Sequence, residues 1–464
     1  MYDISEDGIT LQKAAELCGG KLFGKNGKKI YGVSTDSRKI KENDLFFALV
    51  GENFDGNVFI PQAMEKGAVC AVTSRKDSFP FPYILVDDTL KALGEFAKNY
   101  KSRFSLLTVG VTGSVGKTST KEFIYAVLSQ KYKTAKTDGN FNNEIGMPLT
   151  LIGIDSSYEA AVIEMGMRGM GEISYLTKIA RPDIAVITNI GTSHLENLGT
   201  RENIAKAKLE IAEGLPDDGI LILNGDEPLL KNIGNIKNKV IYAGINDKNC
   251  DYLAYNIKEL PDFISFSVKC PENKILEDIK IPVVGVHNVL NSLYAIVIGL
   301  LSGIDENSIR EGLFAFKGVK LRGEISNKNG VTVIEDCYNA SPESMRASLM
   351  VLSHIAKENG GRKIAFLGDM KELGDDSAKM HFEVGKYAAE SGTDILFTFG
   401  SDAQNIAEGA LQNGFPKENI YKITDTENTD GALEILSKLL KKGDTVLFKA
   451  SRALMLERIS SKIK

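Results

Sequence analysis

A glycine-rich segment of the chain has the composition of a phosphate-binding loop. It follows an apolar run, precedes a helical stretch and reads Gly110-Val-Thr-Gly113-Ser114-Val115-Gly116-Lys117-Thr118-Ser119. In such a loop, backbone N–H groups and the helix N-terminus surround phosphate oxygens, Lys117 neutralises them, and the Thr118 hydroxyl can bind Mg²⁺. We therefore predict a nucleotide site formed by Gly113, Ser114, Val115, Gly116, Lys117, Thr118 and Ser119.

The loop does not match the general pattern G-x-x-x-x-G-K-[ST] fully, because Val111 stands where that pattern has glycine. A glycine turn that only precedes a helix is the alternative interpretation. A GTPase would also carry D-x-x-G and N-K-x-D, and the chain contains neither. A switch protein is therefore the weaker hypothesis, from another functional class.

Two residues with metal-binding side chains follow predicted strands. Glu164 ends the apolar run Ala160–Ile163, where an acid could hold Mg²⁺, and His194 follows the strand that ends at Thr188. Because the carboxyl ends of parallel strands meet at one edge of a sheet, we predict both residues near the phosphate loop. A surface glutamate and a polar loop histidine are the alternative interpretations.

The elements that must position these residues repeat as strand, loop and helix from Leu106 onward. Apolar strands that alternate with helices predict a mostly parallel sheet covered on both faces. The predicted middle strands are Leu106–Val109, Ala160–Ile163 and Ile184–Ile187, with a helix over Lys117–Gln130. A later series of strands is predicted at Val331–Ile334, Ile364–Leu367, Ile395–Thr398 and Thr445–Phe448.

The first part of the chain mixes short strands and helices. Strands are predicted at Asp44–Leu49, Ala68–Thr73 and Tyr83–Val86, helices at Ile9–Leu17 and Thr89–Tyr100, and a hinge at Ser102–Phe104. The segment 225–280 has no pattern that assigns it. We therefore predict an α/β protein of three domains, at residues 1–104, 105–316 and 317–464, the last of them Rossmann-like.

Length and composition agree with this division and exclude several classes of protein. A chain of 464 residues suggests about three domains. The net charge of −5 argues against a nucleic-acid-binding protein, which needs a basic face. The longest apolar run, Leu293–Leu301, is half of a membrane span, and Met1–Asp7 lacks the apolar part of a signal peptide. Five cysteines without a C-x-x-C pair fit a reducing cytoplasm, so we expect a cytoplasmic protein.

Taken in order, these motifs resemble the Mur ligase family, and the resemblance covers nearly the whole chain. The family's short loop T-G-[ST]-x-G-K-T matches Thr112–Thr118, which explains the missing glycine at Val111. Gly139–Thr150 reads G-N-F-N-N-E-I-G-M-P-L-T and is similar to the signature of the dipeptide-adding member. Gly285–Asn291 resembles the adenine-contacting G-x-H-N-x-x-N, and an asparagine amide can pair with the edge of adenine.

Segments in the other two parts also resemble family motifs. In the third part these are Leu321–Glu324, Glu335–Pro342, Gly368–Gly374 with Ser377 and His381, and Lys449–Arg452; in the first part they are Ser34–Arg38 and Gly51–Asn57. The chain departs from the family pattern at four of these positions, which are Glu335, Ser341, Ala450 and Asn57.

The resemblance implies a reaction and a role for each residue. An ATP-dependent ligase would join D-alanyl-D-alanine to UDP-N-acetylmuramoyl-tripeptide (UDP-MurNAc-tripeptide) through an acyl phosphate. Thr118 and Glu164 would hold one Mg²⁺, and His194 with a carbamate on Lys208 a second. The implied catalytic residues are Lys117, Glu164, His194, Lys208, Arg322 and Asp336, with Asn142, Asn288, Asn291, Arg322 and Asp336 also binding the nucleotide. The implied substrate-binding residues are Ser34, Asp36, Ser37, Arg38, Phe54, Asp55, Gly56, Asn339, Lys449 and Ser451.

Several alternatives remain. On pattern alone, Lys206 and Lys208 are solvated lysines of one helix. A sibling ligase that adds one amino acid, or folylpolyglutamate synthetase, is disfavoured by the Asn140–Thr150 and Tyr338–Pro342 segments. A nucleotide-binding module without ligase activity is disfavoured by Glu164, His194 and Lys208. The sequence leaves open whether the third residue of the tripeptide is diaminopimelate or lysine. We expect a monomer.

Overall fold

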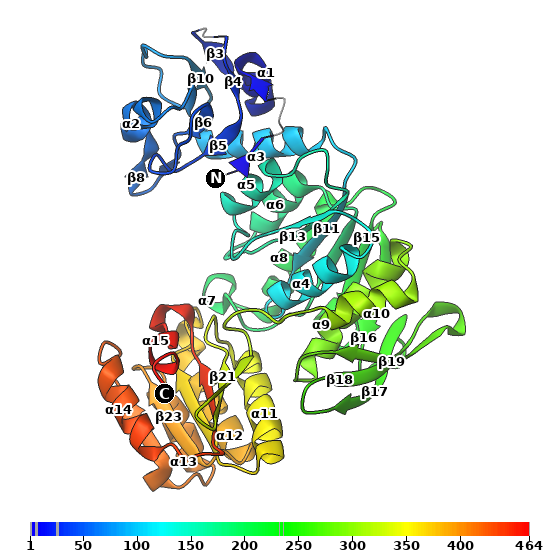
Figure 1. Ribbon diagram of the computed structural model, residues 1–464, viewed down its shortest axis with the longest axis vertical. Coiled ribbons are helices and arrows are strands. Elements are labelled where there is room, and N and C mark those ends of the chain that lie inside the picture. The colour runs from blue at the N-terminus through cyan, green and yellow to red at the C-terminus, as the bar shows by residue number, and fades with distance from the viewer. Residues whose placement is uncertain (1, 5–7, 25–26, 232, 235, 464) are drawn as a thin grey trace.

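The computed structural model describes residues 2–4, 8–24, 27–231, 233–234 and 236–463. Three sheets with flanking helices follow one another from the N-terminal to the C-terminal end of the chain (Figure 1). The predicted α/β class with a mostly parallel central sheet is confirmed. Residues 1 and 5–7, on which the expectation about a signal peptide partly depends, lie outside the described residues.

The first sheet is small and mixed. Its part of the chain contains β1 (Tyr2–Asp3), β2 (Ile9–Thr10), α1 (Leu11–Cys18), β3 (Lys21–Phe23), β4 (Lys29–Ile30), β5 (Gly32–Ser34), β6 (Asp44–Phe47), β7 (Val50–Gly51), β8 (Phe54–Asp55), α2 (Ile60–Glu65), β9 (Cys70–Thr73), β10 (Tyr83–Leu85) and α3 (Thr89–Lys101). The strand order is β1-β5-β6-β9-β10-β3, and β2–β4 and β7–β8 form two separate antiparallel pairs. The helix predicted from Ile9 begins at Leu11, because Ile9 and Thr10 pair with β4 and the Thr10 hydroxyl caps the helix.

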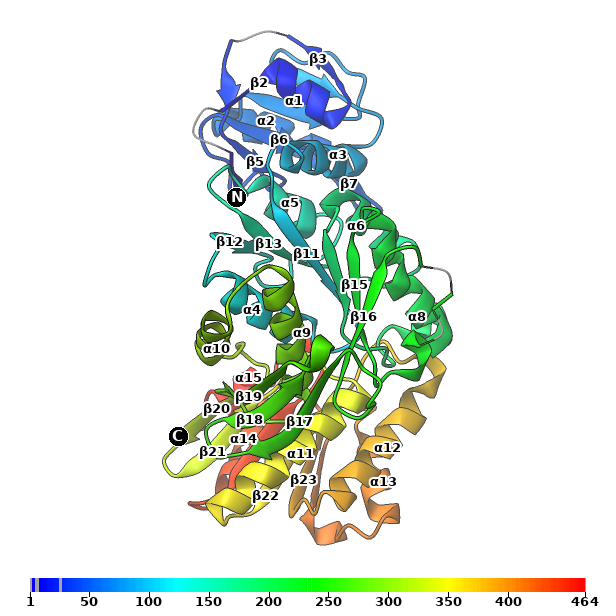
Figure 2. The same ribbon diagram turned by 90° about the vertical axis from the view of Figure 1, so that its right-hand side faces the viewer.

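The central sheet has nine strands and carries the phosphate loop. Its elements are β11 (Leu107–Thr112), α4 (Lys117–Leu128), β12 (Thr134–Lys136), α5 (Gly146–Ile152), β13 (Ala160–Glu164), α6 (Glu172–Ala180), β14 (Ile184–Ile187), α7 (Leu195–Leu198), α8 (Arg201–Leu209), β15 (Ile220–Asn224), β16 (Lys239–Gly244), β17 (Tyr252–Glu259), β18 (Ile264–Lys269), β19 (Ile275–Ile281), α9 (His287–Leu301) and α10 (Glu306–Phe314). In the order β12-β13-β11-β14-β15-β16-β17-β18-β19, only the β17–β18 and β18–β19 pairs are antiparallel. The segment 225–280, unassigned from sequence, therefore supplies β16 and this antiparallel extension (Figure 2).

The third sheet has six strands in the order β20-β21-β25-β22-β23-β24, and all but the β20–β21 pair are parallel. Its elements are β20 (Glu324–Lys328), β21 (Val331–Glu335), α11 (Pro342–Asn359), β22 (Lys363–Gly368), α12 (Ser377–Glu390), β23 (Ile395–Phe399), α13 (Gln404–Gln412), β24 (Ile420–Ile423), α14 (Thr429–Leu439), β25 (Thr445–Lys449) and α15 (Glu457–Ser460). Two separate apolar clusters cover its two faces, as expected for a parallel sheet between helices.

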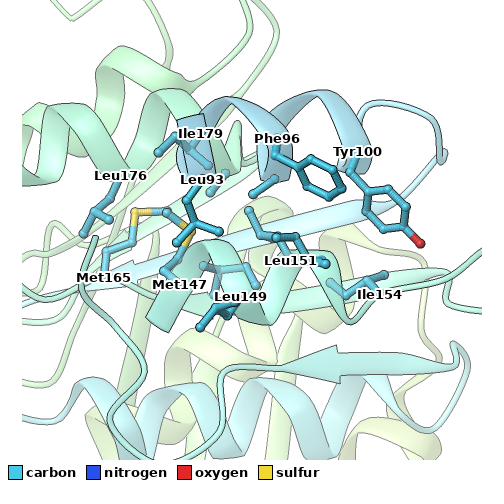
Figure 3. Close-up of a cluster of buried hydrophobic side chains, with 14 of the residues drawn as sticks. Leu93, Phe96, Tyr100, Met147, Leu149, Leu151, Ile154, Met165, Leu176 and Ile179 are labelled. Carbon is cyan, nitrogen blue, oxygen red and sulfur yellow. The ribbon is translucent and has the colours of Figure 1, made fainter. Parts of the chain in front are cut away.

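The first and central sheets share one apolar core, which joins them through α3. Leu93, Phe96 and Tyr100 of α3 face Met147, Leu149, Leu151 and Ile154 on and just after α5, and Leu176 and Ile179 on α6 (Figure 3). The Lys101 ammonium also donates to the carbonyls of Ala180 and Arg181, at 2.8 and 3.1 Å, where α6 ends. The segment predicted as a hinge thus follows a helix that is packed against the next domain.

No helix in the described parts of the chain is long and apolar enough to cross a bilayer. The apolar run Leu293–Leu301 lies on α9, where most of its side chains are buried against the central sheet. Its hydrophobicity is therefore that of a core helix.

Candidate active site

A cavity of about 940 Å³ lies between the central and third sheets. The phosphate loop and the start of α9 line one side, and residues of the third domain line the other. The structure brings these predicted residues together around the cavity: Ser114, Val115, Gly116, Lys117, Thr118, Ser119, Asn288, Asn291, Arg322, Asp336, Asn339 and Lys449. Gly113, Asn142, Glu164, His194, Lys208, Ser451 and the predicted first-domain residues are not among the residues that line it.

The phosphate loop has a conformation that depends on two glycines. Gly113 and Gly116 have φ angles of 150° and 83°, which residues with a Cβ rarely adopt. A Cβ on Gly113 would also lie 1.9 Å from the Thr188 hydroxyl. No side chain caps the first turn of α4, so the N–H groups of that turn are available to an anion.

The Lys117 side chain folds back over the loop. Its ammonium donates to the Gly113 carbonyl at 2.7 Å and to the Ser114 carbonyl at 3.4 Å. Burial lowers the pKa of Lys117. Charges interact more strongly in a buried environment than in bulk water, so this ammonium would attract an anion that enters the cavity.

Glu164 has the features of a metal ligand. Its side chain is buried at the end of β13, and Oε1 accepts a hydrogen bond of 2.9 Å from the Asn142 amide. Oε2 has no hydrogen-bond partner among the described residues, and the nearest cation is Lys121 Nζ at 3.9 Å. Carboxylate oxygens are ligands that Mg²⁺ favours, so Glu164 and the buried Thr118 fit such an ion. Among the described residues, no three His, Cys, Asp or Glu side chains form a metal cluster by themselves.

His194 lies at the contact between the central and third domains. It precedes α7 with a left-handed φ of 66°, and its Nδ1 atom is 2.7 Å from Oε2 of Glu372. This contact lacks the geometry of a hydrogen bond, yet the imidazole lowers the pKa of Glu372. A second contact joins the same loop to the third domain, since the Thr192 hydroxyl lies 3.2 Å from Glu343.

Lys208 is buried, unlike its neighbour on the same helix. Its exposed fraction is 1%, whereas Lys206 is exposed. No hydrogen bond to the Lys208 side chain is found within the described parts of the chain. Burial, and to a lesser extent the charge of Lys117, lowers the pKa of Lys208 well below its ordinary value. Burial therefore disfavours the charged form of this amine relative to an exposed lysine.

Two asparagines at the start of α9 connect that helix to the phosphate loop. Asn291 Nδ2 donates to Asn288 Oδ1 at 3.1 Å, and Asn291 Oδ1 accepts from the Thr120 hydroxyl at 3.2 Å. A Cβ on Gly116 would come within 2.7 Å of Asn291 Oδ1. The helix that was expected to contact adenine is thus positioned directly against the loop.

The third domain contributes a cation and an ion pair to the cavity. The Arg322 guanidinium lies over the Tyr338 ring at 4.3 Å. Lys449 Nζ donates to Asp336 Oδ2 at 2.7 Å and to the Asn339 carbonyl at 3.2 Å. These contacts fix the polar side chains at the carboxyl ends of β21 and β25.

Two other residues of the family motifs have local structural contacts. The Ser451 hydroxyl accepts the Lys371 N–H at 2.9 Å, and so supports the loop after β22. Ser341, where the family pattern has asparagine, caps α11 together with Ser344 in reciprocal hydrogen bonds. The departure at Ser341 therefore preserves a helix cap.

The predicted first-domain residues form two local clusters. Ser34 and Asp36 share a turn, Arg38 pairs with Asp36 at 2.9 Å, and Ser37 donates to Gln62. In the second cluster, Phe54 is half exposed and stacks on Phe59, Asp55 caps the backbone N–H of Asn57, and Gly56 packs against the Leu49 backbone. Asn57, at the position of the usual histidine, is buried and accepts from the Thr73 hydroxyl.

Sequence reasoning missed three residues that contact the predicted site. Asn189 accepts from the N–H groups of Ser114 and Val115, Lys121 is the cation nearest Glu164, and Glu372 meets His194. The position of Asn189 after an apolar strand was a usable signal. The other two contacts depend on tertiary structure.

Comparison with known proteins decides the family. Three descriptions match consecutive parts of the chain: "Mur ligase family, catalytic domain" at residues 29–101, "Mur ligase middle domain" at 111–299, and "Mur ligase, glutamate ligase domain" at 321–452. The chain is also 42% identical to UDP-N-acetylmuramoyl-tripeptide–D-alanyl-D-alanine ligase of Bacillus subtilis (strain 168), over 97% of both chains. The chain belongs to the Mur ligase family.

Solved structures agree with this assignment. The chain superposes on MurF from Acinetobacter baumannii with a TM-score of 0.89, at 29% identity over 98% of both chains. It is similar to MurF ligase from Thermotoga maritima in complex with ADP, with a TM-score of 0.82 and 30% identity over 93% of this chain and 96% of that one. The predicted Mur ligase resemblance and three-domain architecture are confirmed.

Proposed function

We propose that this Mur ligase joins D-alanyl-D-alanine to UDP-MurNAc-tripeptide at the expense of ATP, giving UDP-MurNAc-pentapeptide, ADP and phosphate for peptidoglycan synthesis. The observation that carries the proposal is the 42% identity to a ligase of that name over 97% of both chains. The segment that resembles the dipeptide-adding signature also contacts the site, through the hydrogen bond between Asn142 and Glu164.

The reaction brings two anions together, and the cavity supplies the cations this requires. The terminal carboxylate of the tripeptide attacks the γ-phosphorus of ATP, the bond to the β–γ bridging oxygen breaks, and ADP leaves. Lys117 and Arg322 both line the cavity, and they would offset the charge that develops on the transferred phosphoryl group. Mg²⁺, when bound, neutralises triphosphate oxygens in addition.

Four residues would supply the ligands for Mg²⁺ in this proposal. Thr118 and Glu164 would hold one ion. His194 and a carbamate on Lys208 would hold or orient a second. A neutral lysine amine adds to CO₂ to give a carbamate and one proton, and burial shifts the Lys208 amine toward that neutral form. The product is an anionic oxygen ligand.

The second half of the reaction consumes the acyl phosphate. The free amine of the dipeptide attacks the activated carbonyl and a tetrahedral intermediate forms. The C–O bond to phosphate then breaks, phosphate leaves, and the nitrogen gives up a proton. Because an acyl phosphate hydrolyses in water, the cavity must exclude solvent during this step. Asp336, Asn339 and Lys449 approach from the third domain, which fits a role for that domain in closing the site and binding the acceptor. Ser451 supports the neighbouring loop.

The division of labour follows the three parts of the chain. Residues 1–104 would bind the uridine nucleotide through the two clusters around Asp36 and Phe54, residues 105–316 would bind ATP, and residues 317–464 the acceptor. A single chain carries all of these residues, so a monomer suffices. The proposed reaction would take place in the cytoplasm, which the cysteine content of the chain also favours.

Mass spectrometry of the product tests the proposal. The purified chain is incubated with UDP-MurNAc-tripeptide, MgATP and D-alanyl-D-alanine. We expect a product whose mass equals that of the two substrates minus one water, formed only when ATP is present. Recovery of the unchanged tripeptide from a chain that binds nucleotide would contradict the ligase assignment.

A further inference from the structure

The two residues that follow β14, Thr188 and Asn189, hold the phosphate loop through hydrogen bonds. Asn189 Oδ1 accepts hydrogen bonds from the N–H groups of Ser114 and Val115, at 3.1 and 2.8 Å. The backbone carbonyl of Asn189 also accepts the Ser114 N–H, at 3.2 Å. One side chain therefore holds two consecutive peptide groups of the loop.

Thr188 holds the same turn through a different group. Its hydroxyl donates to the Val115 carbonyl at 2.6 Å, so both polar groups of the Val115 backbone are bound. Thr188 is buried, and its own carbonyl accepts a hydrogen bond of 3.0 Å from the Tyr294 hydroxyl on α9. The close approach of the Thr188 hydroxyl to Gly113 leaves no room for a side chain there.

The donors of the loop are therefore divided into two groups. Those of Ser114 and Val115 are bound by Asn189, whereas the first turn of α4 has no side-chain cap. Gly116, Lys117, Thr118 and Ser119 line the cavity together with Ser114 and Val115. The loop thus has its shape fixed by protein contacts, and the N–H groups nearest the helix remain for phosphate oxygens.

We propose that Thr188 and Asn189 are positioning residues that hold the phosphate loop in its nucleotide-binding shape. This inference rests on the proposed ATP binding and assigns part of that affinity to two residues outside the loop. A loop that is already ordered loses less conformational freedom when phosphate binds, so its affinity for phosphate is higher. The effect should be confined to ligands that carry phosphate.

Calorimetric titration with MgADP and with adenosine separates this role from a general structural one. Adenosine has the base and sugar of ADP but no phosphate. In Asn189→Ala we expect the Kd for MgADP to rise about tenfold, the scale of one lost hydrogen-bonding group, while adenosine affinity is unchanged. Equal weakening of both ligands, or a Kd for MgADP within twofold of the native chain, would overturn the inference.

Two variants of Thr188 provide an independent test of the positioning role, which can be used if Asn189→Ala fails to fold. Thr188→Val removes the hydroxyl at nearly constant volume and should weaken MgADP binding, whereas Thr188→Ser keeps the hydroxyl and should bind nearly as the native chain does. Equal MgADP affinities in the two variants would overturn the inference. If the native chain itself binds no MgADP, the proposed function fails. If the native chain binds MgADP and the variants bind it equally well, only the inference about Thr188 and Asn189 fails.

Discussion

Lys117 is the residue on which the charge balance of the proposed reaction depends most. Its ammonium lies over the phosphate loop and lines the cavity. We expect Lys117→Ala to lower ligation at least ~10²-fold, the scale of losing one preorganised transition-state contact. The fold should survive, because this side chain projects into the site. Phosphate release and a melting curve measure the two effects, and activity above about a tenth of the native value would contradict the assignment.

Lys208 offers a second test at the scale of one residue, with a control on the same helix. Lys208→Ala should lose most of the activity if a carbamate on this lysine helps to hold Mg²⁺. A short carboxylic acid added to the assay should restore part of it, because it returns an anionic oxygen ligand to the site.

The control is Lys206→Ala, which should keep nearly native activity because the Lys206 side chain is exposed. Full activity of Lys208→Ala without added acid would mean that the buried lysine has no part in the reaction. A carbamate would also be visible as an added mass in the intact native chain.

Among the elements, α3 joins the first and central domains, although the boundary predicted from sequence comes just after this helix, at residue 104. Phe96 is fully buried in the core that α3 shares with α5 and α6, and it packs edge-on against Phe47 of the first sheet. We expect Phe96→Ala to cost ~3–5 kcal/mol of unfolding free energy. Because the core is continuous, hydrogen exchange should accelerate both in β9 of the first sheet and in α6 of the central domain.

Lys91→Ala is the matched control, since Lys91 lies on the exposed face of the same helix and such changes are usually within about 0.5 kcal/mol. Faster exchange confined to the first sheet would mean that the two domains unfold separately, and that the shared core does not couple them.

The elements that the sequence predicted well are those whose pattern follows from burial alone. β14 is an uninterrupted buried run, and its predicted bounds, Ile184–Ile187, are those observed. The segment 225–280 was unassigned because its antiparallel strands have one face partly exposed and irregular register. The packing of α3 against α5 and α6 could not be predicted from periodicity. An apolar helix face has the same pattern whether it packs within one domain or against a second.

In the candidate site, too, the residues within motifs could be predicted from sequence, whereas the contacts between domains could not. Motif positions such as Lys117, Asn288 and Asp336 could be assigned from sequence, and the structure places them around one cavity. The contact between His194 and Glu372 joins distant parts of the chain. It arises from how the third domain rests on the central one, which the motif that contains Glu372 does not reveal by itself.

At the scale of the whole molecule, the proposed division of labour can be tested by exchanging domains. Because α3 belongs to the shared core, the exchange should replace the residues before it and keep Thr89–Lys101 from this chain. A chimera with this part of a sibling ligase should change its preference among uridine-nucleotide substrates and still use the dipeptide. The kcat/KM values for each substrate measure both properties. A change in acceptor preference instead would mean that the first domain helps to bind the acceptor.

In the proposed reaction, the cavity between the second and third domains is where a dipeptide is joined to a nucleotide-linked tripeptide. The most direct measurement is phosphate release from MgATP in the presence of UDP-MurNAc-tripeptide, with D-alanyl-D-alanine compared against single amino acids as acceptor. We expect rapid release that depends on the tripeptide and the dipeptide together, and release with single amino acids close to the rate without acceptor. Release that is as fast with a single amino acid as with the dipeptide would contradict it.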